Sequence, residues 1–147
     1  YSPEVYAATA AERIAAGGDR AAFFAASAEG RDLAPRVAAK TGAGLASDVT
    51  AFEIQGDAVT ASHPGYTGKV IVSLRLTGQP ALLSLRPGAI APAEQPRAAR
   101  VETAQPAIDP STARVVVTEM SGRSTARLLV LIHRSLRIAA YSVRVAG

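Results

Sequence analysis

The sequence contains no cysteine, tryptophan or asparagine, and its only histidines are His63 and His133. Without cysteine the chain has no disulfide, no thiolate metal site and no cysteine nucleophile. Two histidines are too few for a catalytic zinc site built from three. The longest strongly apolar run, residues 128–132, is far shorter than the roughly 20 residues that cross a bilayer. We therefore expect no membrane span and no metal site.

Basic charge is concentrated at one end of the chain. The 147 residues carry a net charge of +4, but residues 1–119 hold 11 basic and 12 acidic residues. Residues 120–147 hold five arginines and no acidic residue. The main body therefore has no electrostatic reason to bind nucleic acid. Its hydrophobic content of 48% is enough for the core of one domain.

The first 42 residues have the pattern of an α/β unit. Residues 3–16 are Ala-rich, follow a Ser-Pro start and end at a Gly pair, which predicts a helix. The apolar run 21–26 does not alternate and predicts a strand covered on both faces. Residues 33–40 predict a second helix, with Pro35 in its first turn and Gly42 at its end.

The middle of the chain predicts short strands with tight turns. Ranges 49–55 and 58–62 flank Gly56-Asp57, a hairpin-type turn. Two further strands are expected at 69–76 and 81–85, and a third β segment at 115–117. Residues 87–110 hold five of the nine prolines and predict an extended connector. The expected fold is an incomplete three-layer α/β domain with a mixed sheet, parallel in part and with antiparallel hairpins.

No motif points to catalysis. The segment Gly65–Lys69 has two residues between its first Gly and Gly-Lys, where a Walker loop has four, and no Ser or Thr follows. Ser62 and His63 could be combined with Asp48 or Asp57 into a hydrolase set, but no nucleophile-elbow pattern is present. His133 has no acidic residue in its segment. We predict no catalytic, cofactor-binding or metal-binding residue.

The basic end allows two interpretations. If residues 124–145 were helical, Arg127, Arg134 and Arg144 would share one face opposite the leucines. Such a helix could bind an anionic membrane or RNA. The charge shift after Met120 also fits a reading-frame change near Ser121, in which case this tail has no selected function.

Several motifs in one order carry a family resemblance. The segment EGRDLAPRVAAKTGAGLASDV (residues 29–49), the loop GYTGKV (65–70) and the strand end LLSLRPGAI (82–90) resemble the alpha subunit of electron-transfer flavoproteins, in its N-terminal domain. The resemblance covers residues 1–90 as a partial N-terminal domain. Residues 91–113 are then a linker, and 114–147 a strand with the basic tail.

The resemblance implies an electron carrier and not an enzyme. Members of the family are heterodimers of alpha and beta subunits that contain FAD. They take electrons from flavin dehydrogenases, for example in fatty acid β-oxidation, and pass them toward a quinone reductase or another acceptor. The N-terminal domain frames the heterodimer, while FAD lies mainly on a later domain. By this resemblance the family's first strands and its FAD domain are missing here, and a bacterial cytoplasmic location is expected.

Six positions match the family signature and are expected to be structural or to lie at an interface. They are Arg31, Asp32, Arg36, Tyr66, Gly68 and Arg86. Asp32 is expected as a helix cap, Gly68 in a tight backbone turn, and the arginines in ion pairs. The alternatives to the electron carrier are a stand-alone nucleotide-binding or regulatory α/β module and a protein that binds through its basic tail.

Overall fold

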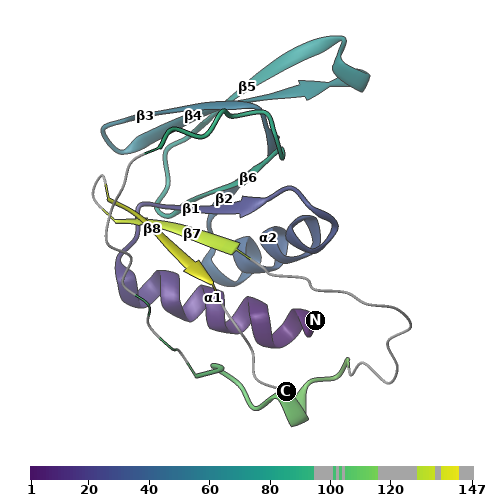
Figure 1. Ribbon diagram of the computed structural model, residues 1–147, viewed down its shortest axis with the longest axis vertical. Coiled ribbons are helices and arrows are strands. Elements are labelled where there is room, and N and C mark those ends of the chain that lie inside the picture. The colour runs from purple at the N-terminus through teal and green to yellow at the C-terminus, as the bar shows by residue number, and fades with distance from the viewer. Residues whose placement is uncertain (95–100, 102, 104, 116–128, 135–136, 143–147) are drawn as a thin grey trace.

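The computed structural model describes residues 1–94, 101, 103, 105–115, 129–134 and 137–142, the last two ranges by their backbone. Its elements form three layers (Figure 1). Helices α1 (Pro3–Gly17) and α2 (Ala28–Thr41) pack together on one side. A five-stranded sheet lies in the middle, and a three-stranded sheet covers its other face.

The central sheet is mixed. It contains β1 (Ala21–Ala25), β2 (Gly44–Val49), β6 (Ala81–Leu85), β7 (Leu129–Arg134) and β8 (Arg137–Ser142), in the order β2-β6-β1-β7-β8. Strands β2, β6 and β1 run parallel. Strand β7 pairs antiparallel with β1, and β8 pairs antiparallel with β7. The predicted α/β fold with a mixed sheet is confirmed.

The outer sheet is antiparallel and consists of β3 (Ala51–Gln55), β4 (Ala58–Gly65) and β5 (Val70–Leu76). The short helix η1 (Tyr66–Gly68) connects β4 to β5. The predicted turn between β3 and β4 is confirmed, with Gly56 at a φ of 57°. Arg20, just before β1, donates to the Gly56 carbonyl and to the Asp57 carboxylate. These bonds hold the turn at the amino end of the parallel strands.

The core lies on both faces of the central sheet. On the helix side, Phe24 and Leu82 belong to one buried cluster with Ile14 of α1 and Leu33 of α2. On the other side, Phe23 and Leu83 belong to a cluster with Val59 of the outer sheet, and Phe23 contacts the ring of Phe52. The first four residues of β1 are all buried, so this strand is covered on both faces as its sequence predicts.

Helix α2 begins earlier than predicted. It starts at Ala28, where the Ser27 hydroxyl caps it by accepting the Gly30 N–H at 3.2 Å. Pro35 therefore lies inside the helix and not in its first turn, and Asp32 is not a cap. The apolar contacts of Leu33, Ala34 and Val37 with the core offset the backbone hydrogen bond that Pro35 cannot make. The end at Gly42, with a φ of 64°, is as predicted.

The observed strands differ from the expected ones in two places. Strand β2 was not predicted, and the expected strand 49–55 is divided, since β2 ends at Val49 and β3 begins at Ala51. The described residues of the tail form β7 and β8 and not the helix considered over 124–145. Strand β1 offers this segment a backbone edge to pair with, and the antiparallel register with β7 uses it. Most of the predicted segment 115–117 lies outside the described residues.

The described part of the connector has no strand, and the segment 107–114, at its end and just beyond, lies against α1. The Ala107 N–H donates to the Thr9 hydroxyl at 3.0 Å. The Arg114 backbone and guanidinium donate to the two Glu4 carboxylate oxygens at 2.8 and 2.7 Å. The short helix η2 (Pro110–Thr112) lies between these contacts. A search of the described residues finds no helix with both the length and the hydrophobicity of a bilayer span.

Candidate functional site

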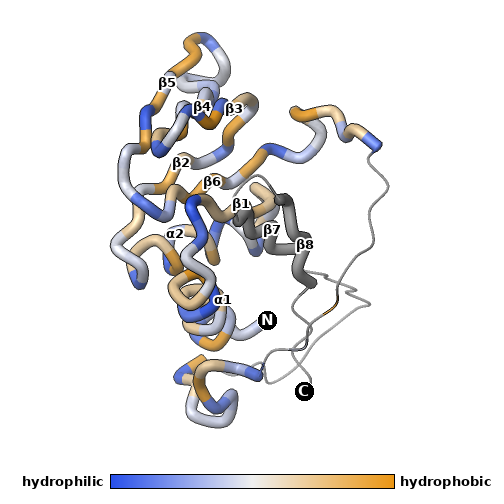
Figure 2. The backbone as a smooth tube through the Cα atoms, turned by 90° about the vertical axis from the view of Figure 1, so that its left-hand side faces the viewer, coloured by the Kyte–Doolittle hydropathy of each residue, from blue (hydrophilic) through white to orange (hydrophobic). Residues whose placement is uncertain are grey.

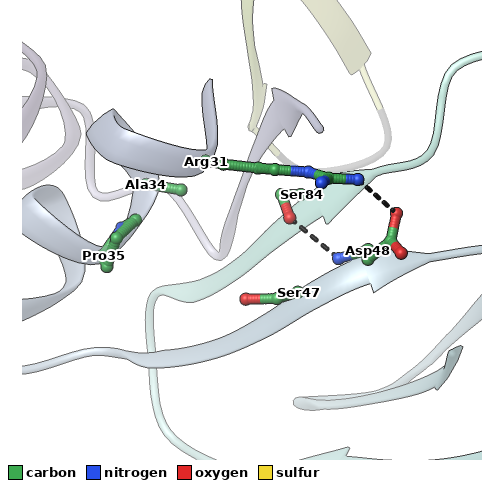
Figure 3. Close-up of a pocket in the computed structure, with 6 residues that line it drawn as sticks. All are labelled: Arg31, Ala34, Pro35, Ser47, Asp48 and Ser84. Carbon is green, nitrogen blue, oxygen red and sulfur yellow. Dashed lines mark hydrogen bonds and ion pairs between the residues drawn. The ribbon is translucent and has the colours of Figure 1, made fainter. Parts of the chain in front are cut away.

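The candidate site lies where the parallel strands end. Because β1, β6 and β2 run in the same direction, their carboxyl ends meet at one edge of the sheet, and α2 begins at that edge. Ligands of open α/β sheets bind outside such edges. Here a pocket of about 340 Å³ is lined by Arg31, Ala34, Pro35, Ser47, Asp48 and Ser84 (Figure 3).

The backbone at Asp48 departs from regular strand geometry. Its φ is 56°, and the pairing register of β2 with β6 shifts between Ala46 and Val49. This shift brings the Asp48 N–H within 2.9 Å of the Ser84 hydroxyl oxygen, which accepts it. Ser84 is 2% exposed, so the hydrogen bond joins β2 to β6 under the pocket. A β-bulge of this kind re-aims a side chain at the end of a strand.

Two arginines converge on the Asp48 carboxylate. Arg86 donates from Nε at 3.1 Å and from a terminal nitrogen at 2.5 Å, and Arg31 reaches it at 3.5 Å. Figure 3 shows Arg31 extending from α2 toward Asp48. The hydrogen bond from Arg86, followed by the charges of Arg86 and Arg31, lowers the pKa of Asp48 against an opposing effect of burial. The same hydrogen bond raises the pKa of Arg86.

A second ionic cluster lies on the exposed side of α2. Arg36 donates to Asp32 at 2.9 Å, and the Tyr1 hydroxyl donates to the other Asp32 oxygen at 2.8 Å. These two hydrogen bonds lower the pKa of Asp32. Partial burial, followed by the bond to Asp32, raises the pKa of Tyr1. The cluster therefore attaches the first residue to α2.

The remaining two signature residues lie at the tip of the β4–β5 hairpin. Tyr66 is 83% exposed. Tyr66, Thr67 and Gly68 have φ values of 49°, 58° and 87°. The predicted need for Gly68 in a tight backbone turn agrees with its positive φ. In Figure 1 this tip is at the end of the outer sheet remote from the helices.

The six signature residues thus occupy three separate places. Arg31 and Arg86 meet at Asp48, Arg36 and Asp32 pair on α2, and Tyr66 and Gly68 form the hairpin tip. The expected ion pairs of the arginines are present. Sequence reasoning considered Asp48 only as a partner for His63 and did not find Ser84. A lone serine in the apolar strand 81–85 was the available signal.

The described residues do not assemble a catalytic set around His63. Ser62 contacts the hydroxyl of Ser73 at 3.5 Å, and its carbonyl accepts from Thr50. The Asp48 carboxylate is engaged by Arg86 and Arg31. Among the residues that the structure describes, no group of three or more His, Asp or Glu side chains could hold a metal ion. The pocket is therefore a site of paired charges and buried hydrogen bonds.

Comparison with known proteins places the chain in a family. Residues 1–110 match the model of the electron transfer flavoprotein domain. The chain is 34% identical over 95 residues to the electron transfer flavoprotein subunit alpha of Methylophilus methylotrophus, covering 64% of this chain and 30% of that protein. It is 35% identical over 68 residues to the subunit alpha of Syntrophomonas wolfei, covering 46% of this chain and 22% of that protein. The chain therefore spans less than a third of these relatives, and it belongs to the electron transfer flavoprotein family.

Proposed function

We propose that this chain serves electron transfer as the N-terminal part of the alpha subunit of a heterodimeric flavoprotein. The observation that carries the proposal is the coincidence of the family match with the folded unit. The match over residues 1–110 includes both helices, the parallel strands, the whole outer sheet and all six signature residues. The part of the molecule with a built core is thus the part shared with the family.

The charged groups support a framing role. Asp48 is paired with Arg86 and Arg31, and Asp32 with Arg36 and Tyr1. An acid or base that transfers protons must change its charge near the working pH. Here the pKa values of both carboxyl groups are lowered, so they remain ionised at neutral pH. We therefore assign the six signature residues to structure and to subunit contact.

The described residues do not fit FAD. A dinucleotide rests its pyrophosphate on a Gly-rich turn at a helix N-terminus. The first turn of α2 instead carries Glu29, and Gly30 lies directly against the Ala25 carbonyl oxygen, where even a Cβ would overlap. In the adjacent pocket Asp48 is paired with Arg31 and Arg86, so these charges are engaged with one another and not directed at a ligand. We place the flavin of the complete carrier on a part of the protein beyond the matched domain.

The proposed partner is the beta subunit, with flavin dehydrogenases as donors and a quinone reductase or another acceptor downstream. A bacterial cytoplasmic location and a role in fatty acid β-oxidation belong to the same proposal. The carrier would relay electrons without transforming a substrate of its own.

Co-expression with the beta subunit encoded in the same genome tests the proposal. The two chains should elute together from a sizing column at the mass of a one-to-one complex. The isolated chain should show no flavin absorbance. Failure to form the complex would contradict the proposal. Tight binding of AMP or ATP by the isolated chain would instead favour the nucleotide-binding module, and salt-sensitive binding to RNA or anionic vesicles the basic-tail alternative.

A further inference from the structure

The tip of the β4–β5 hairpin, residues 64–71, exposes apolar side chains that no described residue covers. Tyr66 is 83% exposed, Ile71 66% and Val70 42%. Figure 2 shows that hydrophobic residues continue along β5 from this tip. Single exposed apolar residues are common on protein surfaces, but three that adjoin on one projecting element suggest a contact surface.

The strand register places apolar residues on both faces of the tip. Ile71 is paired with Pro64, and Val70 is paired with Gly65. Nearer the body of the domain, Val59 and Ala61 of β4 are buried against the central sheet. Alternation along the strand places Gly65 and Val70 on the same face as Ala61, but beyond the buried part of β4. The tip therefore projects past the core, and none of the residues that the structure describes covers either face there.

A backbone hydrogen bond closes the turn at the tip. Tyr66 and Thr67 have positive φ values although neither is glycine. The Lys69 N–H donates to the Tyr66 carbonyl at 3.3 Å and closes the turn. A preformed tip loses less conformational entropy when it binds than a flexible loop would.

Strand β5 also offers backbone groups. It is the last strand in the order β3-β4-β5, so among the described residues one of its sides has no strand neighbour. Exposed edges of this kind pair readily with other chains unless charge or proline prevents it. Strand β5 contains no proline, and Arg75 is its only charged residue.

The charge around the tip selects between possible occupants. No acidic residue occurs between Asp57 and Glu94, whereas Lys69 and Arg75 are exposed on the hairpin. Two copies of this chain joined edge to edge through β5 would bring basic residues together without a carboxylate from either hairpin. A nucleic acid would use the basic residues but leave Ile71 and Val70 against water. The surface thus suits a protein that presents an apolar recess bordered by carboxylates.

We propose that the hairpin tip and the free edge of β5 dock into such a recess on the beta subunit. This inference rests on the proposed function, because it assigns a surface to the heterodimer suggested there. Tyr66 is the expected anchor, since a rigid aromatic side chain with one polar end contributes most to such contacts. Lys69 and Arg75 orient the encounter.

Affinity measurements on the full chain with the purified beta subunit test the inference. The variants Y66A and I71S should each weaken binding roughly 10- to 100-fold, as expected for central interface residues. The variant K69E should weaken binding and remove part of its salt dependence. The matched control V101S changes a residue that is 89% exposed in the connector and should bind like the unchanged chain. Unchanged melting temperatures would show that the hairpin variants still fold.

Hydrogen exchange locates the contact independently of the substitutions. Amides of residues 70–76 should gain protection when the beta subunit is added, and amides of the connector should not. Wild-type affinity in the double variant Y66A/I71S, or unchanged exchange in β5, overturns the docking surface while leaving the heterodimer in place. Absence of any complex with the unchanged chain overturns the proposed function itself. Self-association that Y66A abolishes would make the occupant a second copy and would also overturn the inference.

Discussion

The hydroxyl of Ser84 accepts the backbone N–H of Asp48 at 2.9 Å and so joins the carboxyl ends of β6 and β2. Ser84 is 2% exposed, although it lines the pocket. The bond holds Asp48 in its left-handed conformation, with the carboxylate directed to Arg86. One buried hydroxyl therefore fixes the charge arrangement of the candidate site.

Replacing Ser84 by alanine tests this relationship. The S84A variant leaves the Asp48 N–H without its acceptor, which should lower the free energy of unfolding by about 1–3 kcal/mol. Urea denaturation measures the change. The control S47A removes an exposed hydroxyl from the residue before Asp48 and should lower the free energy of unfolding by less than about 0.5 kcal/mol. Equal stability of the two variants would mean that the Ser84 bond does not hold the bulge.

Acid should weaken the fold through Asp48 and Asp32. The pKa values of both carboxyl groups are lowered in the folded state, mainly by hydrogen bonds from Arg86 and Arg36 respectively. A lowered pKa means that the stabilisation is present above the usual Asp pKa of about 3.9 and is lost as pH falls through the folded value. The difference in unfolding free energy between the unchanged chain and D48N should therefore shrink from pH 7 to pH 3. A difference that stays constant over this range would contradict the role of the Asp48 charge.

Glycine is required at position 30 because α2 passes directly against β1. A Cβ at Gly30 would overlap the Ala25 carbonyl oxygen. The G30A variant should lose about 3 kcal/mol of stability or more, as for severe overpacking. The matched control is G78A, since Gly78 has open space around its Cβ position and no positive φ. Circular dichroism melts should show a large drop in melting temperature for G30A alone. Equal melting temperatures of G30A and G78A would refute the close approach of Gly30 to the Ala25 carbonyl.

The segment 107–114, at the end of the connector, should be released from α1 when Glu4 loses its charge. Arg114 donates to both Glu4 oxygens, and these bonds lower the pKa of Glu4. In E4Q we expect trypsin to cleave after Arg114 several-fold faster, because the peptide bond that follows Arg114 is no longer held against α1. The variant E12Q changes an exposed glutamate of the same helix and should be cleaved at the original rate. Limited proteolysis followed by mass spectrometry reads both rates, and equal rates in the two variants would mean that Glu4 does not hold the connector.

Local signals predicted the elements that depend on local structure. The Ser-Pro start and Gly pair mark α1, the unbroken apolar run marks β1, and the apolar run that Ser84 interrupts marks β6. The start of α2 was missed because Gly30 resembles a loop residue. The contact of Gly30 with the Ala25 carbonyl explains why glycine is present there, and this contact depends on the packing of α2 against β1.

The features that the sequence did not predict depend on pairing between strands that are distant in the chain. Strand β2 contains Ser47 and Asp48, which interrupt its apolar pattern, and its partner β6 is distant in the chain. The resemblance identified Arg31 and Arg86, but their meeting at Asp48 follows only from the β2–β6 register. The tail pattern fitted a helix, whereas the open edge of β1 favours the strands β7 and β8. These differences come from tertiary contacts that override local preference.

The most direct test of the central claim is a calorimetric titration of the full chain with the purified beta subunit. The account predicts saturable binding with one beta subunit per chain. It also predicts much weaker binding by Y66A at equal thermal stability. No heat of binding, together with independent elution of the two proteins from a sizing column, would contradict the assignment of this chain to a flavoprotein heterodimer.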